Sequence, residues 1–63
     1  MVKMNIQYYR EKRGMTQAQL GAAVGVSASA IKAYEGGWES PHLDKAILIA
    51  EALGVTLADL VRE

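Results

Sequence analysis

Glycine residues divide this chain of 63 residues into short segments, and that division limits what the chain can fold into. Glycines stand at positions 14, 25, 36–37 and 54, each directly after a run with apolar residues at helical spacing. Glycine just past such a run is a common signal for the C-terminus of an α-helix. No run alternates with period two for long enough to form a strand. We therefore predict an all-α fold of five short helices.

Hydroxyl side chains mark where several of these helices start. Thr16 with Gln19 three residues later is a capping box, and Thr56 with Asp59 is a similar pair before the last helix. Ser27 stands directly before another apolar-periodic run and is expected to cap it. The expected helices cover approximately residues 4–13, 16–24, 27–35, 41–53 and 56–61.

The fourth helix has the strongest apolar pattern. Ser40 followed by Pro41 predicts a cap and then proline at the first helical position. Steps of three and four residues predict that its buried face consists of Leu43, Ala46, Ile47, Ala50 and Leu53.

Length and composition exclude several classes of protein. The chain has room for one domain, residues 1–63, and it lacks cysteine, so disulfides and thiolate metal sites are excluded. The one histidine, His42, cannot hold a metal alone, and we expect no metal, cofactor or small-molecule ligand. Apolar runs are far shorter than the roughly 20 residues that cross a bilayer, and no signal segment opens the chain. We expect a soluble, intracellular protein.

The overall charge does not favour nucleic acid as a partner, but its distribution does. Seven basic and seven acidic side chains give a formal net charge of zero. Residues 1–13 carry four basic side chains and one acidic one, whereas residues 35–63 carry two basic and six acidic ones. The N-terminal end is therefore expected to face phosphates.

The two helices around Gly25 form a predicted helix-turn-helix. Gly25 allows the positive φ that a tight turn needs, and Ala22 and Ala23 suit a close helix crossing. On a helical wheel at about 100° per residue, Ala30, Ile31 and Tyr34 face inward. The opposite face is small and free of acids, as the major groove of DNA requires, and consists of Ala28, Ser29, Lys32 and Ala33.

A family resemblance follows from these motifs together. The run MTQAQLGAAVGVSASAIKAYEGG, followed by a proline and then AILIAEALGVTLADLV, resembles the Cro/CI-type helix-turn-helix family, which is phage repressor-like and also called XRE-type. The resemblance extends from about Ile6 to Val61. It implies a compact five-helix, lambda-repressor-like domain that binds double-stranded DNA through its third helix in the major groove. For a natural chain, it also implies a cytoplasmic protein of bacterial or phage type.

The resemblance also implies roles for single residues. Arg10 and Glu35 match a pair that forms a partly buried structural ion pair in similar repressors. The residues expected to face bases are Ala28, Ser29, Lys32 and Ala33. Those expected at phosphates are Thr16, Gln17, Ser27, Gly37, Trp38 and Ser40.

The chain departs from the family on this surface. Relatives often carry glutamine, arginine or asparagine where this chain has Ala28, Ser29 and Ala33, so direct base readout should be modest. Glu39 replaces the basic residues usual in the following loop, and we expect it to point away or to contact a cytosine amine. Small residues in a well-capped chain also suggest, as a hypothesis, an engineered recognition surface.

Other interpretations remain open at this point. Lys32 and Ser29 can be solvated surface residues, Gln17 can only favour a helix start, and Trp38 can cover the core. The alternative function is a protein-interaction module that uses an apolar patch around Trp38 or around Leu60 and Val61. An enzyme is disfavoured because no nucleophile–base pair, paired carboxylates or phosphate loop is present. We expect a monomer, with weak dimerisation on DNA through the fifth helix.

Overall fold

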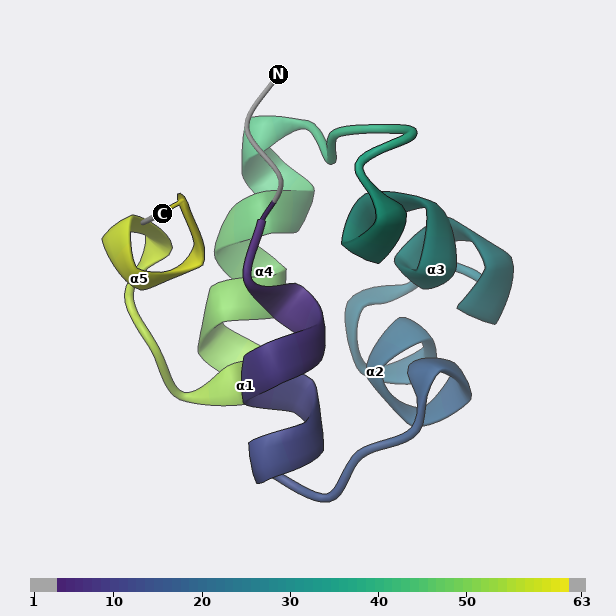
Figure 1. The fold of residues 1–63 in the computed structure, drawn as a ribbon, viewed down its shortest axis with the longest axis horizontal. Helices are drawn as coiled ribbons and strands as arrows, with labels where there is room; N and C mark the ends of the chain where they lie inside the picture. Colours follow the sequence, from purple (N-terminus) through teal and green to yellow (C-terminus); the bar gives the residue numbers. More distant parts are fainter. Residues whose placement is uncertain (1–3, 62–63) are drawn as a thin grey trace.

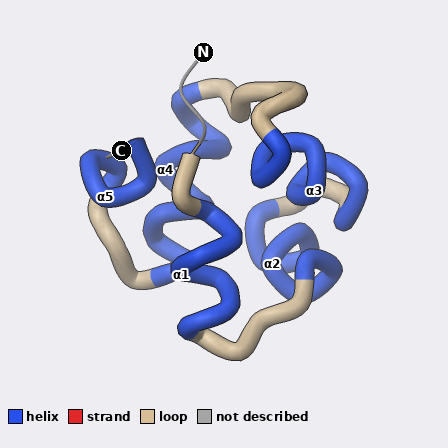
Figure 2. The backbone as a smooth tube through the Cα atoms, viewed as in Figure 1, coloured by secondary structure: helices blue, strands red, loops and turns tan. Residues whose placement is uncertain are grey.

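The computed structural model describes residues 4–61, which fold into five helices (Figure 1). Residues 4–61 contain no strand (Figure 2), and the predicted all-α class is confirmed. Lys3, Arg62 and Glu63, which contribute to the charge distribution above, lie outside the described part. Within that part, no helix is both long and apolar enough to span a bilayer. The helices are α1 Ile6–Lys12, α2 Gln17–Val24, α3 Ala28–Gly36, α4 Leu43–Leu53 and α5 Leu57–Val61.

Local hydrogen bonds set the starts of three helices, as the sequence predicts. The Thr16 hydroxyl accepts from the Gln19 N–H at 3.0 Å, and the Gln19 side chain accepts from the Thr16 N–H at 2.8 Å. The Ser27 hydroxyl accepts from the backbone N–H of Ala30 at 3.1 Å. Thr56 and Asp59 form the same reciprocal pair before α5. Each cap satisfies donors that a helix start leaves unpaired.

All five helices contribute to one apolar core. In Figure 1, α1 and α4 lie in the middle of the molecule, α2 and α3 on one side, and α5 on the other. The side chains with almost no exposed surface are Ile6, Leu20, Ile31, Ile49, Leu53 and Leu60. Because Ile31 is part of this core, α3 is held to the rest of the domain by one face.

The turn between α2 and α3 depends on two glycines. Gly25 has φ +84° and ends α2, as predicted. Gly21 is buried one turn earlier, and a Cβ atom there would lie 2.5 Å from the Val26 carbonyl oxygen. The expectation that Ala22 and Ala23 make the close crossing is wrong, because both are exposed. The chain after the turn passes over Gly21 instead.

Helix α4 also holds the end of α2. The Lys45 ammonium donates to the Val24 carbonyl oxygen at 3.0 Å, across the gap between the two helices. Carbonyls in the last turn of a helix lack partners within the helix, and they favour a nearby cation. This contact fixes the point from which the turn to α3 begins.

The start of α4 differs from the prediction. Its first helical hydrogen bond runs from the Ala46 N–H to the His42 carbonyl at 2.9 Å, so His42 is the N-cap residue. Pro41 is buried before the helix, and Ser40 does not cap it. Pro41 packs inward, and the extended backbone of His42, with ψ 160°, separates it from the first helical residue.

The predicted buried face of α4 is correct for only part of its residues. Ala46, Ala50 and Leu53 are buried as expected, but Leu43 is 66% exposed and Ile47 is 42% exposed. Ile49, which the prediction omitted, is fully buried. The helix has apolar residues around much of its circumference, so the periodicity fits two orientations, and its contacts with α1, α2 and α5 select one.

The close approach at Gly21 leads to a prediction. Gly→Ala in a helix ordinarily stabilises by about 1 kcal/mol. We expect Gly21→Ala to lower the free energy of unfolding by about 1–3 kcal/mol instead, because the methyl group would displace the turn. Urea denaturation followed by circular dichroism measures this change. The control is Ala22→Gly, at an exposed position of the same helix, which shows the effect of helix propensity alone. A Gly21→Ala variant that is more stable than the original chain would contradict the packing argument.

Candidate nucleic-acid interface

The outer face of α3 is open to solvent, as the helical wheel predicts. Ser29 and Lys32 are exposed, and Ala28 and Ala33 are half-buried, whereas Ile31 on the opposite face is fully buried. Three of these four outer side chains are very small, so a second molecule can approach the backbone of α3 closely. The structure thus brings together the four residues predicted to face DNA bases.

Lys32 supplies the positive charge of this face. Within residues 4–61, no acidic side chain forms an ion pair with it. The nearest acid along the helix, Glu35, is 5% exposed and is bonded to other residues. An ammonium group without an acidic partner remains available for a phosphate or for the edge of a base.

The predicted ion pair between Arg10 and Glu35 is present and buried. Arg10 Nε donates to Glu35 Oε2 at 2.6 Å, and Arg10 Nη2 donates to Glu35 Oε1 at 3.3 Å. Arg10 Nη1 donates to the Met15 carbonyl oxygen at 2.7 Å. The hydrogen bond with Glu35 raises the pKa of the Arg10 guanidinium above its ordinary value. The pair therefore joins α1, the turn before α2 and the end of α3.

Gln17 belongs to the same network. Its Nε2 donates to Glu35 Oε1 at 3.0 Å, and the side chain is half-buried at the first residue of α2. An amide nitrogen carries two hydrogens, so one remains for a phosphate after this bond. The contact with Glu35 also holds the amide in place.

The two capping hydroxyls are exposed, and each can still donate a hydrogen bond. Thr16 and Ser27 each use their oxygen to accept a backbone N–H. A hydroxyl can accept and donate at once, so each O–H can still donate to a phosphate. Both residues are structural caps with or without DNA.

The segment after α3 offers fewer donors than the sequence suggests. The Gly37 N–H donates to the Tyr34 carbonyl at 3.3 Å, and the N–H groups of Trp38 and Glu39 donate to the Ala33 carbonyl at 3.0 and 3.4 Å. These bonds close the C-terminus of α3, where Gly37 has φ +80°. Gly37, which also lacks a side chain, has no donor left for a phosphate. Ser40 and Glu39 are exposed.

Trp38 does not cover the core. Its side chain is 71% exposed and lies over Gly36, where an added Cβ would be 3.3 Å from the ring. A shallow hollow of about 250 Å³ lies beside it, lined by Gln7, Gln17, Lys32, Glu35, Gly36 and Trp38. Sequence reasoning missed Gln7 as part of this surface. The available signal was its position three residues before Arg10, on the same side of α1.

The basic residues near the N-terminus have different surroundings. Arg10 is buried with Glu35, and Lys12 Nζ lies 5.4 Å from the centroid of the Tyr8 ring. The Arg13 guanidinium lies beside Gly54 at the end of α4, 2.8 Å from where a Cβ would be. The expectation drawn from the charge of residues 1–13 is wrong for Arg10, which is buried and bonded to Glu35. Lys12 and Arg13 are exposed, and a role for them at phosphates stays a prediction.

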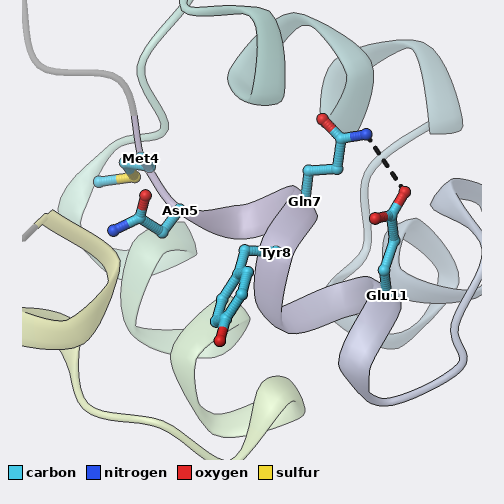
Figure 3. A pocket seen from close by; sticks show the side chains of 5 residues that line it. All are labelled: Met4, Asn5, Gln7, Tyr8 and Glu11. Carbon is cyan, nitrogen blue, oxygen red and sulfur yellow. Dashed lines mark hydrogen bonds between the residues drawn. The ribbon is translucent and has the colours of Figure 1, made fainter. Parts of the chain in front are cut away.

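A second hollow, of about 290 Å³, lies along α1 (Figure 3). Gln7 donates to Glu11 at 3.2 Å on one side of the helix, while Tyr8 points to another side. Tyr8 is exposed, Tyr9 packs against the core, and the two rings meet edge to face at 5.0 Å. The two tyrosines are thus one surface and one core residue, and they do not form a stacking platform.

The buried ion pair generates a prediction. Arg10→Met leaves the Glu35 carboxylate buried without its cation, and we expect the free energy of unfolding to fall by about 3–5 kcal/mol. Chemical denaturation measures the change. Glu11→Gln is the control: Glu11 is exposed and 3.9 Å from Arg10 Nη2, and its loss should cost less than about 1 kcal/mol. Equal losses in the two variants would show that the Glu35 pair has no special role.

Comparisons with known proteins agree with this geometry. A family model described as helix-turn-helix matches residues 6–60. An uncharacterized HTH-type transcriptional regulator of Methanocaldococcus jannaschii is 37% identical over 59 residues, which cover 94% of this chain and 89% of that protein. The cryptic phage CTXphi transcriptional repressor RstR of Vibrio cholerae is 32% identical over 63 residues, which cover 100% of this chain and 57% of the repressor.

A solved structure extends the similarity to the whole fold. The P22 c2 repressor in complex with a synthetic operator superposes with a TM-score of 0.88 and 31% identity, over 92% of this chain and 88% of that one. None of these matches supports the hypothesis of an engineered recognition surface. The chain belongs to the helix-turn-helix family, of the Cro/CI, phage repressor-like type.

Proposed function

We propose that this domain binds double-stranded DNA by placing the outer face of α3 in the major groove. The observation that carries the proposal is the contrast between the two faces of α3. Ile31 anchors one face in the core, while the other presents Lys32 among small side chains. Lys32 has no acidic partner among residues 4–61. A helix with such a face fits a groove about 12 Å wide and does not repel its phosphates.

The relatives support this assignment and suggest a role in transcription. The M. jannaschii protein is named as a transcriptional regulator, RstR is named as a repressor, and the P22 c2 structure contains an operator. The chain spans little more than half the length of RstR, so a repressor role for this chain is part of the proposal. We propose a binding role in transcription regulation and no catalytic one.

We propose two groups of contacts. Base edges face Ala28, Ser29, Lys32 and Ala33. Phosphates accept hydrogen bonds from the remaining N–H of Gln17 and from the hydroxyls of Thr16 and Ser27. After α3, the indole N–H of Trp38 and the hydroxyl of Ser40 bind further phosphates. Phosphate contacts set the position of the protein, whereas base contacts set its sequence preference. We further propose that the domain is a monomer in solution and dimerises weakly on DNA through α5.

A second candidate function is a protein-interaction module. It is favoured by four exposed apolar side chains on α4 and α5, namely Leu43, Ile47, Leu48 and Val61. Leu60, which the sequence placed in such a patch, is fully buried and belongs to the core. The four exposed side chains lie on helices other than α3, so the two functions use different surfaces. Binding to DNA falls steeply as salt is raised, whereas an apolar interface depends on salt much less.

Selection from a randomised duplex library tests the proposed function directly. Enrichment of one short motif is the expected result. The selected duplex is then titrated against the protein, with fluorescence of Trp38 as the signal, because Trp38 is the one tryptophan in the chain and is exposed beside α3. Failure to enrich any motif, together with unchanged fluorescence at low salt, would reject DNA binding.

Charge reversal on α3 gives a sharper prediction. Lys32→Glu should weaken binding of the selected duplex at least about tenfold and make the salt dependence shallower, because a negative charge would face the phosphates. Fluorescence titration at several salt concentrations measures both effects. Lys12→Glu changes the net charge equally, but at the end of α1 beside Tyr8, and should have a much smaller effect. Equal losses in the two variants would indicate a response to net charge and not to contact with α3.

A further inference from the structure

We infer that Ala28 and Ala33 recognise thymine methyl groups, so that the DNA site requires an A·T pair opposite each of them. This inference rests on the proposed function and assigns the base class that the outer face of α3 selects. It follows from what the side chains on this face can reach, and from what the neighbouring long side chains are already bonded to.

The two alanines occupy the flanks of the outer face of α3. Both are half-buried, and the exposed Ser29 and Lys32 lie between them on the helical wheel. They are five residues apart, which is about 7.5 Å along the helix axis. This distance is more than twice the roughly 3.4 Å between successive base pairs, so each alanine faces a different pair.

Two long polar side chains near α3 are already bonded within the domain. Glu35 is held by Arg10, and Gln17 is held by Glu35, so both are bonded within the domain. Trp38 lies over Gly36, the last residue of the helix. Lys32 is the one long donor of the outer face, and it can reach a single guanine edge at a time.

An alanine methyl group distinguishes bases through apolar contact. Thymine is the base that presents a methyl group in the major groove, whereas cytosine presents an amino donor. Contact between the two methyl groups removes both from water. A cytosine at the same place would leave its amino group facing a side chain that cannot accept a hydrogen bond. The outer face of α3 therefore favours thymine opposite each alanine.

Uracil substitution tests the inference, because deoxyuridine differs from thymidine only by the methyl group. The probe is the duplex most enriched by the library selection, with each thymidine replaced singly. We expect about fourfold weaker binding at two or more positions, as loss of one buried methyl-sized group implies. At those positions, replacing the T·A pair by C·G should also weaken binding, and 5-methylcytosine should restore part of the loss.

Protein variants assign each position to its alanine. Ala28→Gly should abolish the uracil penalty at one position and Ala33→Gly at the other. Ala58→Gly is the matched control, since Ala58 is exposed on α5, on the opposite side of the molecule from α3 (Figure 1). Thermal unfolding verifies that each variant is folded. The 5-methylcytosine measurement uses the unchanged protein, so it does not depend on the folding of any variant.

The outcomes separate this inference from the proposed function. Tight, salt-dependent binding that no uracil substitution weakens would overturn thymine recognition and leave DNA binding intact. Uracil penalties that persist unchanged in both alanine variants would also overturn it, because other residues would then contact the methyl groups. If no duplex is enriched at all, the proposed function fails, and the inference fails with it.

Discussion

The orientation of α3 in the domain depends on the buried guanidinium of Arg10. It donates to Glu35 near the end of α3 and to the Met15 carbonyl in the turn before α2, and Gln17 at the start of α2 shares the same carboxylate. One cation thus joins three segments that are distant in sequence. Removing charges from water is costly, and the cost is offset only when every charged group is bonded, as it is here. The network therefore permits one arrangement of α1, α2 and α3.

This network also changes the electrostatics of the surface. Glu35 is an acid on the helix proposed to enter DNA, but it is buried and bonded to Arg10, so its charge is neutralised. Lys32 remains exposed and without an acidic partner in the described part of the chain. A domain with zero formal net charge can therefore still present a positive face at the helix that matters. The ion pairs close to α3, and not the net charge of the chain, therefore set the electrostatic potential around this helix.

Several features of the fold and the site follow from sequence because they are local. The capping pair of Thr16 and Gln19 and the left-handed turn at Gly25 involve residues within a few positions of one another. Backbone donors at a helix start need nearby acceptors, and a positive φ favours glycine, so short stretches of sequence determine these elements. The outer face of α3 is equally predictable, because Ile31 is the one large aliphatic residue of this helix and identifies its buried side.

Other features depend on packing between distant segments, and only the tertiary structure decided them. The apolar residues of α4 fit two orientations, and its neighbours selected the one that buries Ile49 and exposes Leu43. Arg10 is buried in place of facing solvent because Glu35, 25 residues further along the chain, lies opposite it in the folded domain. The sequence by itself determined where most helices begin, end and turn, with the start of α4 as the exception. Tertiary structure decided which faces and charges remain free, because burial and ion pairing depend on what lies opposite each side chain in space.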